Sequence, residues 1–252
     1  MINVLKGYTT LLLIIFVFSN YGKAQKSITL EDIWTTGALN ARSVPGFNFM
    51  NDGKHYTRNE RGNIEQYNLL TGQKVNTLFD GVSFKGKEGF TVMSSYKFNA
   101  DESKVLILSE AESIFRRSSK VTSHIFDIKT QKLVAVAKNK KIINPTFSPD
   151  GSKIAYTMDF NMYIYDLKSG KEVQITKDGQ KNAILNGLCD WVYEEEFGFT
   201  QAYEWNSNSD QIAFIRFDER DVPLFSMDMY DNDMYPRAET FKYPKVGEQN
   251  AK

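Results

Sequence analysis

Four stretches of this sequence share one pattern, and that pattern restricts the fold more than any other feature. Each stretch begins with an aromatic residue, continues through a polar turn, and returns to an apolar residue seven positions later. The stretches are residues 49–56, 98–105, 147–154 and 205–212, so their starts lie 49, 49 and 58 residues apart. The Asn, Asp, Ser, Pro and Gly residues in the turns suit tight connections between antiparallel strands. The repeat therefore predicts hairpins that recur along the chain.

Further strand-like runs complete each repeat. Apolar runs follow three of the turns, at residues 105–108, 154–157 and 212–215, and others precede a second polar turn, at residues 64–69, 123–128 and 162–167. Four short antiparallel strands that recur every 40 to 50 residues or so are typical of a β-propeller blade. We therefore expect an all-β fold, a partial β-propeller of about four four-stranded antiparallel blades. The alternative is a β-sandwich whose segments resemble one another by chance.

The number of repeats does not decide whether they form a complete propeller or part of a larger one. A propeller closes with about four to eight blades. Either the repeats form a closed four-bladed ring, or the chain is part of a longer propeller. In the second case uncovered strand edges would invite pairing between chains, and we expect poor solubility.

Composition excludes several classes of function. Lys and Arg together number 31 and equal Asp and Glu together, so the chain lacks the basic excess of a nucleic-acid-binding protein. The single cysteine, Cys189, excludes an intrachain disulfide and a multi-cysteine zinc site. With two histidines in the whole chain, we expect no metal centre and no cofactor.

Residues 1–24 are arranged as a secretory signal peptide. Lys6 provides a positive charge, residues 11–18 form an apolar core, and small residues at Gly22 and Ala24 permit cleavage before Gln25. The apolar run is shorter than the roughly 18 residues that span a bilayer. An uncleaved anchor and a buried N-terminal strand or helix are the alternatives. Export without disulfides suits the periplasm or cell envelope of a bacterium, and residues 25–252 are then the folded part.

One segment interrupts the repeat. The third interval, which leads to the fourth repeat, is nine residues longer than the others, and the extra length falls near three adjacent glutamates, Glu194, Glu195 and Glu196. Trp191 and Tyr193 precede them as supporting aromatic residues. Carboxylates among aromatic rings are costly to bury unless a cation, such as a ligand ammonium group, pairs with them. On a short helical insertion the three would fan over about 200°, so at most two converge. The alternative is a solvated charged face.

The same segment resembles a known family. Residues 190–196, Asp-Trp-Val-Tyr-Glu-Glu-Glu, look like the glutamate motif of the dipeptidyl peptidase IV group of prolyl oligopeptidase-type serine peptidases. Residues 28–34, 217–224, 235–237 and 243–247 are also similar to stretches of that group, so the resemblance covers about residues 26–247. It implies an eight-bladed propeller followed by an α/β-hydrolase domain. It also implies removal of dipeptides from free N-termini, with proline or alanine as the second residue.

The resemblance also implies a substrate-binding site. By motif position, Glu195 and Glu196 would bind the substrate ammonium group, with Glu194 as the supporting member. In the family an arginine from a preceding blade holds a backbone carbonyl of the substrate. Arg116 lies in the expected place and is the better match, and its neighbour Arg117 is the alternative. Both arginines could instead belong to a solvent-facing basic turn.

The residues that carry out catalysis in such enzymes are not found in the chain. Acyl transfer by this mechanism needs a Ser-His-Asp triad, and the sequence has no Gly-x-Ser-x-Gly elbow. We expect the N-terminal fragment of an exported serine exopeptidase, inactive alone, with no catalytic residue of its own. Its partners would be peptides with a free N-terminus and the missing C-terminal hydrolase domain. The full-length protein could form a homodimer.

Two other functions remain open at this point. The first is a non-catalytic envelope β-propeller that binds a protein or peptide partner. The second is a related enzyme that releases tripeptides and shares the glutamate motif. The gene sequence beyond the codon for Lys252 would separate the first from a peptidase.

Overall fold

The computed structural model describes residues 26–41, 46–230 and 232–252. The chain divides into two compact units, Met1–Pro45 and Gly46–Lys252. The predicted signal peptide lies outside the described residues and stays a prediction. Among the residues that are described, no helix is both long and apolar enough to cross a membrane.

In the first unit, the described residues contain one short helix, α2 (Leu30–Trp34). Thr29 caps its N-terminus: the Thr29 hydroxyl accepts a hydrogen bond from the Asp32 N–H, and the Asp32 carboxylate accepts one from the Thr29 N–H, both at 3.1 Å. This reciprocal capping box satisfies two N–H groups that have no partner within the helix.

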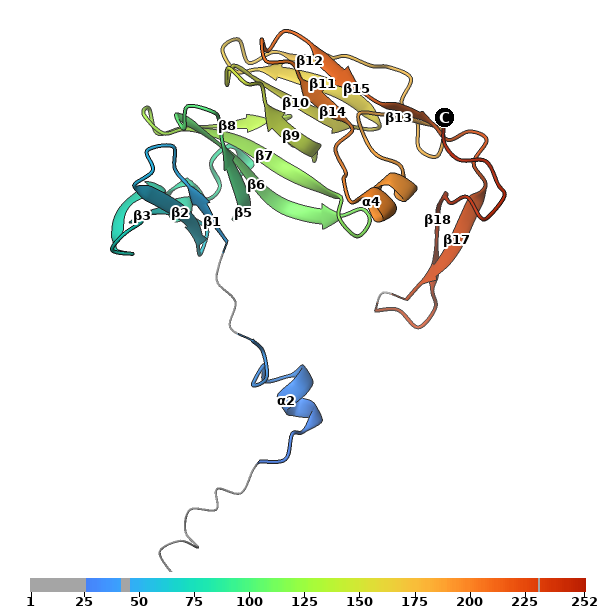
Figure 1. The fold of residues 1–252 in the computed structure, drawn as a ribbon, viewed down its shortest axis with the longest axis horizontal. Coiled ribbons are helices and arrows are strands. Elements are labelled where there is room, and N and C mark those ends of the chain that lie inside the picture. The colour runs from blue at the N-terminus through green and yellow to red at the C-terminus, as the bar shows by residue number, and fades with distance from the viewer. Residues whose placement is uncertain (1–25, 42–45, 231) are drawn as a thin grey trace, which may run out of the picture. The chain divides into compact units, whose positions relative to one another are not determined.

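Three four-stranded antiparallel sheets follow one another in the second unit (Figure 1). Within each sheet, strands that are neighbours in sequence are also neighbours in space. The first contains β1 (Phe47–Phe49), β2 (His55–Glu60), β3 (Asn63–Asn68) and β4 (Lys74–Phe79); the second contains β5 (Met93–Phe98), β6 (Lys104–Ser113), β7 (Ser119–Asp127) and β8 (Lys132–Val136); the third contains β9 (Ile143–Phe147), β10 (Lys153–Met158), β11 (Asn161–Asp166) and β12 (Glu172–Gln174). A short helix α3 (Gly81–Phe84) and a 3₁₀ turn η1 (Lys87–Gly89) join the first sheet to the second.

The repeated turns have one common geometry. Each aromatic residue that begins the sequence repeat ends a strand, and it is paired with the apolar residue seven positions later: Phe49 with Tyr56, Phe98 with Val105, Phe147 with Ile154, and Trp205 with Ile212. In each turn the fifth residue of the repeat adopts a left-handed φ between 57° and 66°: Gly53, Glu102, Gly151 and Ser209. Its N–H donates to the carbonyl three residues earlier. The repeat found in the sequence is therefore a repeat of structure.

Hydrogen bonds between these turns connect the first repeat to the second and the third repeat to the fourth. The N–H of Asn51 in the first turn donates to the Glu102 carboxylate in the second, at 2.8 Å. The N–H of Asp150 in the third turn donates to the Ser209 hydroxyl in the fourth, at 3.0 Å. In both cases the fifth residue of the later repeat accepts a hydrogen bond from the turn of the earlier one, so neighbouring repeats are in contact, as expected of propeller blades.

The fourth repeat is divided by the helical insertion. Its strands are β13 (Ile184–Asn186), β14 (Tyr203–Trp205), β15 (Ile212–Phe214) and β16 (Arg216–Asp218), with helix α4 (Trp191–Phe197) between β13 and β14. They form two pairs, β13 with β16 and β14 with β15, instead of one four-stranded sheet. A further hairpin, β17 (Leu224–Met229) and β18 (Arg237–Lys242), comes next. The prediction of a partial β-propeller with a short helical insertion is confirmed, and the fourth blade is the irregular one.

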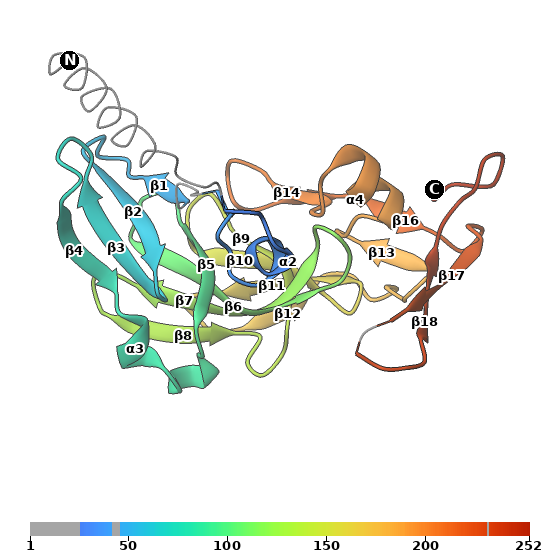
Figure 2. The same cartoon turned by 90° about the horizontal axis from the view of Figure 1, so that it is seen from below.

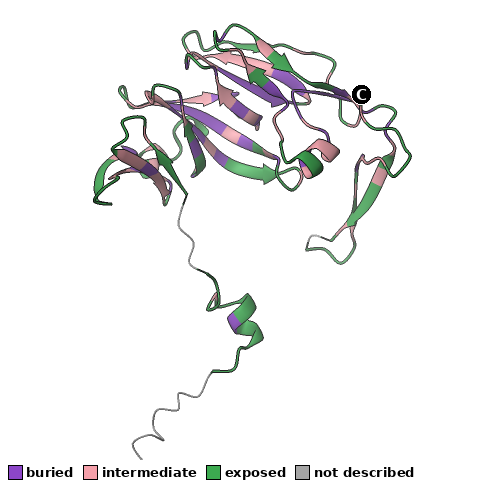
Figure 3. Ribbon diagram, viewed as in Figure 1, coloured by how far each residue is buried: buried purple, intermediate pink, exposed green. Residues whose placement is uncertain are grey.

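The apolar core lies between adjacent sheets, where the central strands are buried (Figures 1 and 3). Phe79 of the first sheet packs edge-to-face against Phe126 of the second, with ring centroids 4.9 Å apart, and both are fully buried. Leu106 and Ile125 of the second sheet share a second cluster with Ile154 of the third. Burial of these side chains stabilises the stacking of one sheet on the next.

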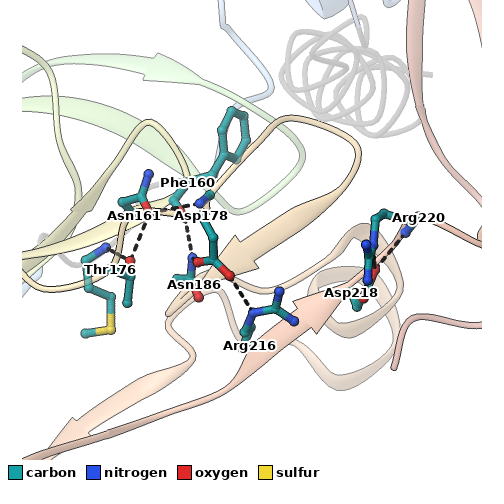
Figure 4. A network of polar contacts seen from close by, with 10 residues as sticks. Phe160, Asn161, Thr176, Asp178, Asn186, Arg216, Asp218 and Arg220 are labelled. Atoms are coloured by element: carbon teal, nitrogen blue, oxygen red, sulfur yellow. Dashed lines mark hydrogen bonds and ion pairs between the residues drawn. The ribbon is translucent and has the colours of Figure 1, made fainter.

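Strand β13 precedes α4 (Figure 2), and a polar network of side chains fixes this strand (Figure 4). The Asp178 carboxylate accepts hydrogen bonds from the Asn186 side chain on β13 and from Nε of Arg216 on β16, each at 2.9 Å. Nearby, the Asn161 side-chain oxygen accepts from the Thr176 hydroxyl at 3.0 Å. The network joins the third sheet to the pair of strands on either side of the insertion.

Candidate functional site

Helix α4 has a defined beginning and end. Asp190 caps its N-terminus, where the carboxylate accepts a hydrogen bond from the Tyr193 N–H at 2.8 Å. Gly198 ends it with a left-handed φ of 75°, a conformation that glycine adopts without strain. Burial raises the pKa of the Asp190 carboxyl, and the bond from Tyr193 opposes that shift. These local signals make a short helix of the segment that the sequence marked as an insertion.

The three glutamates of α4 meet three different environments. Glu194 is buried, with 2% of its surface exposed. The Glu195 side chain is 16% exposed, and Glu196 is exposed. Successive residues of a helix are rotated by about 100°, so three neighbours cannot share one face. The helix therefore keeps two carboxylates accessible and turns the third inward.

Glu194 binds the tip of the β6–β7 hairpin. One oxygen of its carboxylate accepts hydrogen bonds from the N–H groups of Arg117, at 2.6 Å, and Ser118, at 2.8 Å. The tip is closed by a bond from the Ile114 N–H to the Ser118 carbonyl at 2.9 Å. Hydrogen bonds to an ionised acceptor are about twice as strong as neutral ones. The buried carboxylate therefore holds this loop against α4 (Figure 1).

The loop brings Arg116 to the accessible glutamates. A guanidinium nitrogen of Arg116 lies 3.6 Å from a carboxylate oxygen of Glu195, and 74% of the Arg116 side chain is exposed. Arg117 contributes its backbone N–H to Glu194, and within the described part of the chain no ion pair involves its guanidinium. The structure thus gathers Arg116, Glu194 and Glu195, with Glu196 at the next helical position.

Aromatic side chains surround this group. Trp191 lies against Phe241 and Tyr243 of the last hairpin, with ring centroids 5.8 and 4.7 Å apart. Tyr193 is on the other side of the helix, and its ring contacts Phe197, Phe199 and Phe217. The two aromatic residues that precede the glutamates therefore anchor α4 on opposite sides.

Two titratable groups with raised pKa values lie close to α4, the buried Glu219 and the partly buried Cys189. Glu219 is 5% exposed, and burial, together with the charge of Asp190, raises the pKa of its carboxyl to about 7, against the effect of Lys242. Burial first, and then the charges of Asp190 and Glu194, raise the pKa of the Cys189 thiol to about 12, so it stays a thiol at neutral pH. Sequence reasoning missed Glu219, because a single glutamate after a strand belongs to no recognisable pattern.

The chemistry available here is recognition of charge. Accessible carboxylates accept hydrogen bonds from a cation, and a guanidinium donates to carbonyl or carboxylate oxygens. Within the described ranges, no group of three or more His, Cys, Asp or Glu side chains is arranged to hold a metal ion. The site is therefore suited to a ligand that has both an ammonium group and a nearby carbonyl.

Comparison with known proteins identifies the family. Residues 99–252, more than half of the chain, match the model of the dipeptidyl peptidase IV (DPP IV) N-terminal region. The chain belongs to this family. The match includes both the Arg116 loop and the glutamate helix. The matched residues begin in the turn between β5 and β6 of the second sheet.

Relatives of this DPP IV-type chain are peptidases. It is 29% identical to prolyl endopeptidase FAP of Homo sapiens over 93% of its length, and 30% identical to a probable dipeptidyl-aminopeptidase B of Emericella nidulans over 92%. Its structure is similar to the crystal structure of Porphyromonas gingivalis dipeptidyl peptidase 4, with a TM-score of 0.81 and 38% identity over 90% of the chain. The chain spans 30%, 28% and 32% of these proteins, respectively.

Proposed function

We propose that this chain is the N-terminal propeller part of an exported DPP IV-like serine exopeptidase, in which it binds the free N-terminus of peptide substrates. The observation that carries the proposal is the position of Arg116, whose guanidinium lies 3.6 Å from Glu195 on the glutamate helix. These are the residue types that an N-terminal ammonium group and the adjacent peptide carbonyl require.

In the proposed complex the carboxylates of Glu195 and Glu196 accept hydrogen bonds from the substrate ammonium group, and Arg116 donates to a backbone carbonyl. A peptide with a blocked N-terminus has no such cation and would leave the two carboxylates without a partner. Breaking a desolvated charge pair costs about 3–5 kcal/mol, which corresponds to roughly two to four decades in specificity. The site would therefore select for a free amine.

The same arrangement would set the cleavage position. Two extended residues span at most about 7 Å. If the serine of a following hydrolase domain lies at that distance from the glutamates, cleavage occurs after the second residue. Hydrolysis belongs to that domain in this proposal, and the chain itself supplies binding.

The proposal is tested by removing each carboxylate charge in the full-length parent enzyme. With a dipeptidyl anilide that has a free amine, Glu195→Gln and Glu196→Gln should each lower kcat/KM about 100-fold or more, because the ammonium group loses a charged acceptor. Glu112→Gln is the matched control, since that side chain is 60% exposed on β6 and pairs with Lys141 instead. An unchanged kcat/KM in the α4 variants would reject the proposed role.

Export and self-association are further parts of the proposal. If the signal peptide is cleaved, mass spectrometry of the envelope protein will find Gln25 as its first residue; a mature chain that begins at Met1 would reject cleavage.

A homodimer would show twice the monomer mass in light scattering. The exposed apolar side chains of the last hairpin, among them Leu224 and Tyr235, favour self-association.

A further inference from the structure

One aromatic side chain contacts both halves of the candidate site. Phe241 of β18 is 8% exposed. Its ring lies 5.8 Å from that of Phe115, which directly precedes Arg116, and 5.8 Å from that of Trp191, the first residue of the glutamate helix. Edge-to-face and tilted ring contacts at such distances are stabilising. A single residue of the last hairpin therefore lies between the arginine loop and the glutamate helix.

The hairpin supports Phe241 from behind. Phe225 on β17 contacts Phe241 and Tyr243, with ring centroids 5.9 and 5.3 Å apart. β17 and β18 are paired along their whole length, from Leu224 with Lys242 to Met229 with Arg237. Phe241 thus belongs to a regular element, whereas Phe115 belongs to a loop.

The arginine loop has few other restraints near its guanidinium. Glu194 binds the backbone of the loop, but that contact fixes Arg117 and Ser118. The Arg116 side chain is 74% exposed, and its contact with Glu195 is a single 3.6 Å ion pair. Exposed ion pairs hold geometry weakly. The placement of Arg116 then depends on how its neighbour Phe115 is packed.

We infer that Phe241 is a positioning residue, which sets the position of Arg116 relative to the glutamates and thereby the affinity for substrates with a free N-terminus. The inference rests on the proposed function. It assigns to the β17–β18 hairpin a role at the site that Phe241 exerts through its contacts with Phe115 and Trp191. The loop and the helix, which are hydrogen-bonded across 76 residues of sequence, then also have Phe241 as a common aromatic neighbour.

The test is a steady-state analysis of Phe241→Leu in the full-length parent enzyme. We expect KM for a dipeptidyl anilide with a free amine to rise about three- to tenfold, the loss expected when an aromatic contact is removed. We expect kcat to change much less. A merely structural defect would instead lower the active fraction and leave KM unchanged. Phe241→Tyr, which keeps the ring, should restore KM.

Phe225→Leu is the matched control. It makes the same substitution in the same hairpin, but the ring of Phe225 packs on Phe241 and Tyr243 and not on Phe115 or Trp191. We expect its KM to rise clearly less than that of Phe241→Leu, because Phe225 supports Phe241 but contacts neither Phe115 nor Trp191. An unchanged KM in Phe241→Leu, or an equal rise in both variants, would overturn the inference.

A second variant covers the case in which Phe241→Leu does not fold. Phe115→Leu removes the same contact from the half-buried loop side and should raise KM by a similar factor; an unchanged KM would overturn the inference. If Phe241→Leu folds, the double variant should be no worse than Phe241→Leu alone, because that substitution already removes the contact with Phe115. A wild-type enzyme that does not prefer a free amine would reject the proposed function itself, which separates the two failures.

Discussion

At the scale of single residues, consecutive glutamates on α4 have distinct tasks because a helix rotates them apart. Glu194 points inward and holds the backbone of the arginine loop, while Glu195 and Glu196 stay accessible. The sequence alone was enough to single out the three glutamates and to predict that at most two of their carboxylates converge. The partner of Glu194 could not be predicted, because Ser118 lies 76 residues away.

Glu219 makes stability depend on pH. Its carboxyl has a pKa of about 7 in the folded chain against an ordinary 4.5, so the folded state holds the proton more tightly than the unfolded state. The free energy of unfolding should therefore fall as pH rises from about 4.5 to 7, by roughly 3 kcal/mol, and level off above 7. Urea unfolding at several pH values measures this.

Substitution of Glu219 shows whether its carboxyl causes this fall in the free energy of unfolding. Glu219→Gln should remove most of this fall, because the amide does not ionise. Glu204→Gln, at an exposed position of β14, should keep it. If the wild type and Glu219→Gln have parallel pH profiles, the assignment is wrong.

At the scale of elements, a comparison of two of the four turns separates the effect of backbone strain on stability from the effect of packing between sheets. Gly53 and Gly151 have nearly the same left-handed φ, 64° and 66°. A Cβ at residue 53 would meet nothing within 4 Å, whereas one at residue 151 would lie 2.6 Å from the Asn99 side-chain nitrogen in the preceding turn. Gly53→Ala should cost about 1–2 kcal/mol of unfolding free energy, from backbone strain alone.

Gly151→Ala should cost more, by about 1–3 kcal/mol, because Asn99 must move and the contact between adjacent sheets is disturbed. Urea unfolding of both variants, followed by tryptophan fluorescence, gives the difference. Equal losses in the two variants would show that the turns do not hold the sheets together.

The elements differ in how far the sequence predicts them. Turns and hairpins of the repeat could be predicted, because their chemistry is local: polar turn residues, and an apolar pair seven positions apart. The division of the fourth repeat could not, because pairing of β13 with β16 depends on strands separated by the helix and another hairpin. For the same reason the aromatic contact among Phe115, Trp191 and Phe241 left no pattern in the sequence.

At the scale of the whole molecule, the proposed function assigns substrate binding to this DPP IV-type chain and hydrolysis to a separate hydrolase domain. It spans about 30% of the relatives it matches, and no stretch of its sequence forms a Gly-x-Ser-x-Gly elbow. Its three regular sheets and divided fourth repeat hold an arginine loop against a glutamate helix. The central claim is that this contact recognises a free peptide N-terminus.

The most direct measurement compares two substrates of the full-length parent enzyme that differ only at the amine. Glycyl-prolyl anilide has a free amine, and its N-acetyl derivative does not. We predict that kcat/KM for the free amine exceeds that for the acetylated form by about two decades or more. Equal values of kcat/KM for the two substrates would contradict the account.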